Sequence, residues 1–293
     1  MDQQFWCNLD CVPTQVSQWF DATVLGVLGL LIGSFLNVVI YRLPVMLEAQ
    51  WKADCADMLD QVTPATAPFN LMLPRSRCPQ CNHLIRWYEN IPLVSYLFLR
   101  GKCSACATPI SLRYPLVELL CGALFFYCAW TWGATPTGLA WSGFAAALLA
   151  LGFIDWDTTL LPDDITLPLL WAGLIAAALH WTPVGLPAAM WGAVAGYLSL
   201  WLVYWAFKLV TGKEGMGFGD FKLFAALGAW FGWQALIPLI LMASVLGAIV
   251  GIAMKFSSGL REGGYVPFGP FLALAGFTAM FFSPGAILRF LGL

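Results

Sequence analysis

Two pairs of cysteines are the first residues in this sequence whose types and spacing could do chemistry. Cys78 and Cys81 enclose two residues, as do Cys103 and Cys106, and residues 82–102 separate the pairs. Zn²⁺ takes four thiolates at the corners of a tetrahedron, and two Cys-x-x-Cys turns supply two each. The spacing therefore predicts a structural zinc site, because four thiolates leave no open position for a reaction. Reduced thiols or two disulfides are the alternative, and His83 is read as an exposed polar residue.

Two carboxylates at the edges of apolar runs form a second candidate site. Asp155 follows the apolar run that ends at Ile154, and Asp220 ends the glycine-rich segment that begins at Gly215. A carboxylate at membrane depth is costly and is therefore a functional hypothesis. Two carboxyl groups that face each other share a proton, so that one activates water while the other donates to a carbonyl oxygen. The pair predicts an aspartic peptidase.

Other interpretations of these aspartates stay open. A carboxylate at a membrane interface can simply be solvated. Asp157 and Asp163 compete with Asp155 for its role, and Asp163 and Asp164 can cap the helix that follows Pro162. No rival hydrolase motif is present, since the chain has only two histidines and no HExxH or GxSxG sequence.

The composition indicates which elements position these residues. Of 293 residues, 60% are hydrophobic and only 10% are charged, against about 25% charged in an ordinary soluble domain. So few charges cannot cover the surface of a soluble protein of this length. Lys+Arg 14 against Asp+Glu 16 gives no basic face, which excludes a nucleic-acid binder. The sequence predicts an all-α polytopic membrane protein.

Apolar runs predict about eight transmembrane helices with a small zinc-stapled domain between the first and the second. The first run covers 19–43, with the helix crossing the membrane over 19–41. Residues 223–254 fit either two helices with a break at Gly232-Trp233-Gln234 or one helix kinked at Pro238. The other seven crossings are expected at 115–133, 137–154, 165–182, 186–210, 221–233, 235–254 and 268–288.

The basic residues predict the orientation of the chain. The polar block 42–113 carries eight of the fourteen basic residues, so the positive-inside rule places it in the cytoplasm. Residues 1–18 contain no Lys or Arg and are expected outside. Cys7 and Cys11 lie there and could pair, although unpaired thiols fit their spacing as well. Residues 114–293 then form a seven-helix membrane domain.

In these motifs the sequence resembles the bacterial type IV prepilin leader peptidases, which are bifunctional membrane enzymes. The match runs nearly end to end. It covers Gly33–Pro44 (GSFLNVVIYRLP), Pro74–Cys81 (PRSRCPQC), Asn90–Pro92, Ser95–Leu97, Leu99–Cys103, Arg113–Glu118 (RYPLVE) and the segments around Asp155 and Asp220.

The resemblance implies a function and a site. Such an enzyme cuts the short basic leader from prepilins and from pseudopilins of type II secretion, after a glycine and on the cytoplasmic side. It then methylates the new N-terminal amine with S-adenosylmethionine. The family's catalytic aspartates match Asp155 and Asp220, and its zinc ligands match the four cysteines Cys78, Cys81, Cys103 and Cys106.

The resemblance also implies a multi-pass protein of the bacterial inner membrane, with residues 1–18 in the periplasm and the 114–293 domain as the peptidase. Contacts to S-adenosylmethionine are not assigned; the candidates are the polar residues of 75–113, alone or together with the glycine-rich stretch before Asp220. Two alternatives are a peptidase whose cytoplasmic block is only structural, and a non-enzymatic assembly factor. The sequence predicts precursors and the lipid bilayer as partners, and it predicts no oligomeric state.

Overall fold

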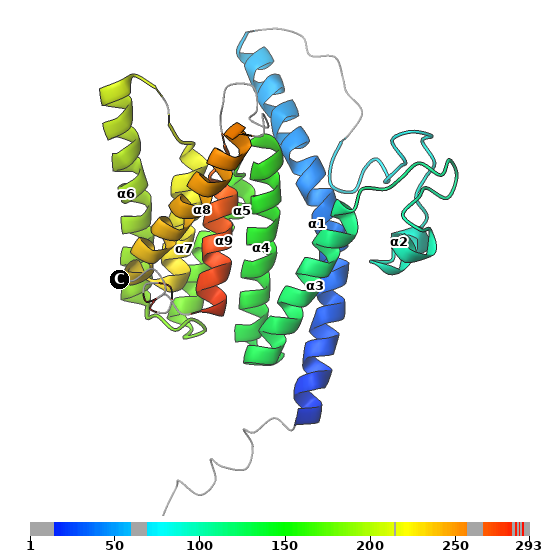
Figure 1. Cartoon of the computed structure of the whole chain (residues 1–293), viewed down its shortest axis with the longest axis horizontal. Coiled ribbons are helices and arrows are strands. Elements are labelled where there is room, and N and C mark those ends of the chain that lie inside the picture. Colours follow the sequence, from blue (N-terminus) through cyan, green and yellow to red (C-terminus); the bar gives the residue numbers. More distant parts are fainter. Residues whose placement is uncertain are drawn as a thin grey trace, which may run out of the picture. The chain divides into compact units, whose positions relative to one another are not determined.

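The structure is a computed structural model that describes residues 15–59, 69–213, 215–256, 266–282, 285, 287 and 289. Among these residues the regular elements are all helical, as the composition predicts (Figure 1). Cys7 and Cys11 lie outside the described residues. The elements are α1 (Gln15–Met58), η1 (Trp87–Asn90), α2 (Val94–Phe98), α3 (Arg113–Trp132), α4 (Pro136–Thr158), α5 (Asp163–Ala178), α6 (Leu186–Thr211), α7 (Phe218–Phe231), η2 (Trp233–Ala235), α8 (Leu236–Phe256) and α9 (Gly269–Phe281).

The chain divides into two compact units. The first comprises Met1–Phe35 with Arg86–Gly143, and the second comprises Leu36–Ile85 with Phe144–Leu293. In the first unit, small residues let the start of α1 approach α3 closely. A Cβ atom built at Gly29 would lie 2.7 Å from Cβ of Phe125, and one built at Gly33 would lie 2.7 Å from Cα of Glu118. Glycine is therefore required where these two helices touch.

The first helix is longer than the first predicted crossing. α1 has 44 residues and continues to Met58, with Pro44 inside it. The first predicted run ends at residue 43, because the chain becomes polar in the block 42–113. The residues that follow Pro44 are mostly good helix formers such as Leu47, Glu48 and Ala49, and they extend the helix into the polar part of the chain.

In the second unit, α7 lies at the centre of the helix packing. It contacts α5, α6, α8 and α9 (Figure 1), and Phe221 and Leu223–Phe231 are buried. Trp230 Nε1 donates a hydrogen bond to the Leu169 carbonyl of α5 at 2.9 Å. The backbones of Gly192 in α6 and Gly228 in α7 touch, which leaves no room for a side chain at either position. The helix that carries Asp220 is thus fixed from several sides.

Within the described part of the chain, five helical segments are long and apolar enough to cross a membrane: 17–58, 113–132, 136–158, 186–211 and 233–256. The chain is therefore a multi-pass membrane protein. The other three predicted crossings correspond to α5, α7 and α9, which have 16, 14 and 13 residues and are shorter than the roughly 20 residues that a crossing needs.

The long apolar run 223–254 is broken at the predicted position. α7 ends at Phe231, and Gly232 has a φ of +78°, a conformation that favours glycine. The short helix η2 follows, and α8 begins at Leu236. The alternative, one helix kinked at Pro238, is wrong, because Pro238 lies in the first turn of α8, where a proline leaves no helical hydrogen bond unmade.

Candidate active site and metal site

The two Cys-x-x-Cys segments fold into the same local turn. In the first, the Cys78 N–H donates to the His83 carbonyl at 2.9 Å and the Asn82 N–H donates to the Cys78 carbonyl at 3.0 Å. In the second, the Cys103 N–H donates to the Thr108 carbonyl at 2.8 Å and the Ala107 N–H donates to the Cys103 carbonyl at 3.0 Å. Each turn thereby presents its two thiols on the same side of the backbone.

Each turn also contains one residue with left-handed backbone geometry, directly after its second cysteine. These residues are Asn82, with φ of 57°, and Ala107, with φ of 56°. A positive φ is uncommon outside glycine and is most costly for residues that cannot bond locally, such as alanine. Repetition of the same costly geometry in both turns indicates that it serves the placement of the cysteines.

The four cysteine sulfurs form one cluster. Their Sγ atoms all lie within 4.8 Å of one another, and the four residues are thiols with no disulfide among them. In tetrahedral zinc sites the Zn–S bonds are about 2.3 Å, which places sulfurs about 3.8 Å apart. The cluster is thus compatible with a metal ion, and its donors suit zinc. No open coordination position would remain, so the expected role is structural.

Asp155 lies near the end of α4 and is almost completely buried, with 4% of its surface exposed. Its Oδ2 atom accepts a hydrogen bond from the N–H of Gly269 at 2.9 Å. Gly269 is the first residue of α9, where backbone N–H groups have no helical partner. The start of α9 therefore orients the Asp155 carboxyl group.

Asp220 lies in the first turn of α7 and has 7% of its surface exposed. Its Oδ2 atom accepts a hydrogen bond from the N–H of Gly217 at 3.2 Å, and its own N–H donates to the Gly217 carbonyl at 3.2 Å. This is the capping-box arrangement, in which an acidic residue bonds back to the start of its helix. The glycine-rich segment predicted to accompany Asp220 is thus what holds it.

Asp155 and Asp220 come together in the structure. The two carboxyl groups are close enough to interact electrostatically. Leu161, in the loop after α4, contacts the segments that hold both of them. A Cβ atom at Gly219 would lie 2.6 Å from Leu161 Cβ, and one at Gly269 would lie 3.2 Å from Leu161 Cδ1. The ends of α4, α7 and α9 therefore converge on one buried pair of carboxyl groups.

The competing aspartates have other environments. Asp157, Asp163 and Asp164 are exposed. Asp163, at the start of α5, accepts from Lys222 Nζ of α7 through both carboxylate oxygens, at 2.7 Å each. This ion pair links α5 to α7 beside the buried pair without being part of it.

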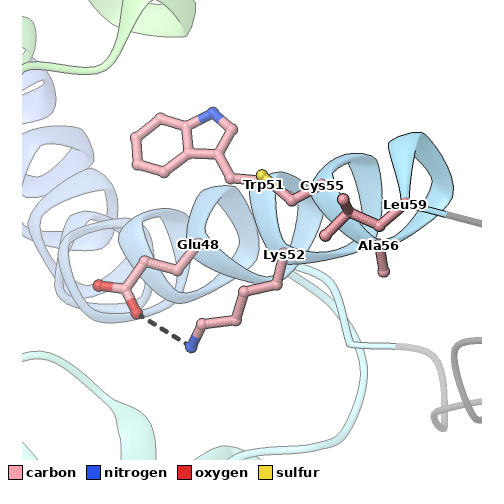
Figure 2. A pocket seen from close by; sticks show the side chains of 6 residues that line it. All are labelled: Glu48, Trp51, Lys52, Cys55, Ala56 and Leu59. Atoms are coloured by element: carbon pink, nitrogen blue, oxygen red, sulfur yellow. Dashed lines mark ion pairs between the residues drawn. The ribbon is translucent and has the colours of Figure 1, made fainter. Parts of the chain in front are cut away.

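A separate hollow lies along the last part of α1. Figure 2 shows that it is lined by Glu48, Trp51, Lys52, Cys55 and Ala56 of this helix and by Leu59, directly after its end. Its Glu48–Lys52 ion pair is 4.0 Å long and largely exposed, and such surface pairs contribute little to stability. None of the predicted site residues lines it.

Two residues at the site, Gly269 and Leu161, were not predicted from the sequence. Gly269 lies between Pro267 and Pro270 at the start of an apolar helix. A glycine between two prolines beside a helix start is a detectable signal, since it marks a backbone of restricted shape with room for close approach. Leu161 carries no such signal, because one leucine among many apolar residues is not distinctive.

Replacing Gly269 with alanine is expected to reduce peptide cleavage about 100-fold, the loss typical of a displacement of about 1 Å in a catalytic group. The new Cβ atom would lie 2.6 Å from Oδ2 of Asp155 and would push the carboxyl group away. Gly143→Ala is the matched control, since a Cβ atom there meets nothing within 4 Å. Cleavage rates of both variants in membranes provide the measurement, and equal rates would contradict the proposed contact.

A multi-pass helical protein with a buried carboxyl pair at one junction of helices has the features of a membrane-embedded aspartic peptidase. Two family models match it: the bacterial peptidase A24 N-terminal domain over residues 27–132 and the type IV leader peptidase family over residues 142–252. The chain belongs to the type IV leader peptidase family.

Close relatives carry the name prepilin leader peptidase/N-methyltransferase. The protein from Stutzerimonas stutzeri is 56% identical over 87% of this chain and 88% of its own length. Those from Pseudomonas putida and Aeromonas hydrophila are 54% and 51% identical, over 88% and 89% of this chain and 89% and 91% of their own lengths. No solved structure matches this chain.

Proposed function

We propose that this chain removes the basic leader from type IV prepilins and type II secretion pseudopilins and then methylates the new N-terminal amine. The observation that carries the peptidase half is the buried pair formed by Asp155 and Asp220. The names of its relatives, which describe both activities in those proteins, support the combination.

The carboxyl pair supplies the acid and the base that peptide hydrolysis requires. One ionised carboxylate takes a proton from water as the water oxygen attacks the carbonyl carbon of the leader glycine. The other carboxyl group, still protonated, donates to the carbonyl oxygen. When the C–N bond breaks, the first carboxyl group gives the proton that it took from water to the amine nitrogen of the mature chain, and the second regains its proton from the former carbonyl oxygen. The backbone N–H groups of Gly269 and Gly217 keep both carboxyl groups oriented during these steps.

Burial supports Asp155 as the first member of the pair. The nearby alternatives Asp157 and Asp163 are exposed, and both carboxylate oxygens of Asp163 bind Lys222. Asp155 in contrast accepts a buried hydrogen bond from α9 and interacts with Asp220. We therefore assign catalysis to Asp155 and Asp220, and the link between α5 and α7 to Asp163.

The cysteine cluster supports a metal site in the polar segment. We infer that Cys78, Cys81, Cys103 and Cys106 hold a structural zinc ion that folds the polar segment around them. S-adenosylmethionine, when bound, supplies the methyl group to the neutral amine nitrogen. The exposed polar residues of 75–113 are the region in which we place this second activity.

The basic residues support the orientation. Eight of the chain's fourteen Lys and Arg residues lie in residues 42–113, which contain the cysteine turns, and Lys222 lies two residues after Asp220. By the positive-inside rule, both sites face the cytoplasm from the bacterial inner membrane. The mature part of a prepilin begins with an apolar helix, so its own insertion in the bilayer presents the leader on that side.

A two-step assay in lipid nanodiscs tests this function. The full chain is incubated with a prepilin-like precursor, and the products are weighed by mass spectrometry. We expect one cut after the leader glycine and, with S-adenosylmethionine, a further gain of one methyl group on the mature product. Cleavage without methylation would show that the chain has the peptidase activity alone. Absence of cleavage by the folded chain in nanodiscs would contradict the peptidase activity and favour a non-enzymatic assembly factor.

A further inference from the structure

The short helix α2, in the first unit, has one polar side and one apolar side. On the polar side, Ser95 is buried; its hydroxyl donates to the Tyr88 carbonyl at 2.8 Å and accepts from the Ile91 N–H at 2.9 Å. Val94, Leu97 and Phe98 form the other side, here called the α2 apolar face, because residues three and four apart share a helix face. Leu97 and Phe98 are 74% and 84% exposed.

A hydrogen bond fixes the start of α2 against a membrane-crossing helix. The N–H of Leu93, the residue before α2, donates to Oε2 of Glu118 at 2.9 Å. Glu118 is buried in the second turn of α3, which is one of the candidate membrane spans. Five residues of helix rise about 7.5 Å, and interfacial helices bury their apolar side about 5–10 Å deep. The start of α2 is thus tied to α3 within the first two turns of this candidate span.

The charges around α2 fit an anionic lipid surface. The segment 86–112 contains three basic residues, Arg86, Arg100 and Lys102, all exposed, and one acidic residue, Glu89. Oε2 of Glu89 accepts a hydrogen bond from the backbone N–H of Arg86. Trp87, in the turn before α2, is 79% exposed, and tryptophan prefers the membrane–water interface. Exposed aromatic and apolar side chains among basic ones are typical of surface-bound membrane anchors.

We propose that the α2 apolar face inserts into the headgroup region of an anionic lipid leaflet and anchors the segment 86–112 to the membrane surface. The anchor holds this segment, which includes Cys103 and Cys106, at the membrane surface where α3 enters the bilayer. This inference rests on the membrane position of α3 and does not depend on either proposed activity.

Lipid photo-crosslinking tests the anchor. The full chain is placed in nanodiscs of phosphatidylcholine with phosphatidylglycerol that carries a photoreactive group near the headgroup, and adducts are mapped by mass spectrometry. Residues 94–98 are expected to carry at least about tenfold more adducts than residues 104–107. This ratio corresponds to the free energy gained when one large apolar side chain is removed from water. Residues 104–107 are the internal control because they are also exposed.

A double variant and a change of lipid complete the test. Leu97→Ser with Phe98→Ser should lower the adducts on residues 94–98 about tenfold while zinc content stays unchanged, which shows that the cysteine turns remain folded. Neutral nanodiscs, in which only phosphatidylcholine carries the photoreactive group, should give fewer adducts. Equal labelling in neutral and anionic discs, labelling no higher than at 104–107, or crosslinking to an added precursor peptide in place of lipid would each overturn the proposal.

Discussion

Replacing Asp155 or Asp220 with asparagine is expected to reduce cleavage by about 100- to 10,000-fold, the contribution that a positioned acid or base makes to such a reaction. Asparagine keeps the shape of the side chain, and its amide oxygen can still accept the hydrogen bond from Gly269 or from Gly217. It can neither take a proton from water nor donate one as a carboxylic acid does. The measurement is the initial cleavage rate of a precursor peptide by each variant in nanodiscs.

The double variant sharpens this prediction. If the two carboxyl groups act as a unit, removing both costs no more than removing either one, because effects within such a unit are not additive. Asp157→Asn is the control, and its cleavage rate should match that of the unchanged chain. Methyl transfer to a precleaved peptide should persist in all four variants, which shows that they fold. Cleavage that survives Asp155→Asn and disappears in Asp157→Asn would reassign the first carboxylate.

Loss of one cysteine of the cluster is expected to remove the metal and to unfold the turns around it. Structural zinc sites of this kind contribute about 10–16 kcal/mol of apparent binding energy, which a small polar segment cannot replace with a core of its own. Cys78→Ser and Cys103→Ser should therefore lose zinc, become sensitive to protease within 69–112 and lose methyl transfer. Zinc per chain, measured by mass spectrometry of the metal, is the primary readout.

Cys55 provides the matched control for the metal experiment. It is an exposed cysteine of α1 and is not part of the cluster. Cys55→Ser should keep zinc and methyl transfer. A strong chelator applied to the unchanged chain should reproduce the effect of Cys78→Ser, and added zinc should reverse it. Zinc content and methyl transfer that persist in Cys78→Ser would show that the cluster holds no metal.

The candidate site was predictable where its signal is local. Cys78 and Cys81 are three residues apart, so one turn suffices to bring them together. Asp220 follows glycines that its own helix start requires. Asp155 and Asp220 could be paired from the sequence because both end or begin apolar runs on the same side of the predicted topology. In each case the residues that flank the site residue in the sequence indicated its role.

The contacts that the sequence did not reveal join distant segments. The hydrogen bond from Gly269 to Asp155 spans 114 residues, and the Lys222–Asp163 pair spans 59. Neither contact leaves a periodic pattern in the sequence, and each depends on how several helices pack. The number of membrane crossings was hard to derive for a similar reason: hydropathy detects apolar length, whereas α7 is short and is covered by neighbouring helices.

The burial of most of α7 among neighbouring helices has a consequence for how the protein is made. A helix of 14 residues is about 21 Å long, and the hydrocarbon layer is about 30 Å thick. Such a segment is a poor substrate for insertion by itself, whereas α5 and α6, both synthesised earlier, supply the surfaces on which it packs. Biogenesis of the Asp220 helix is thus coupled to prior assembly of α5 and α6, and proteolytic activity can arise only after most of the chain has left the ribosome.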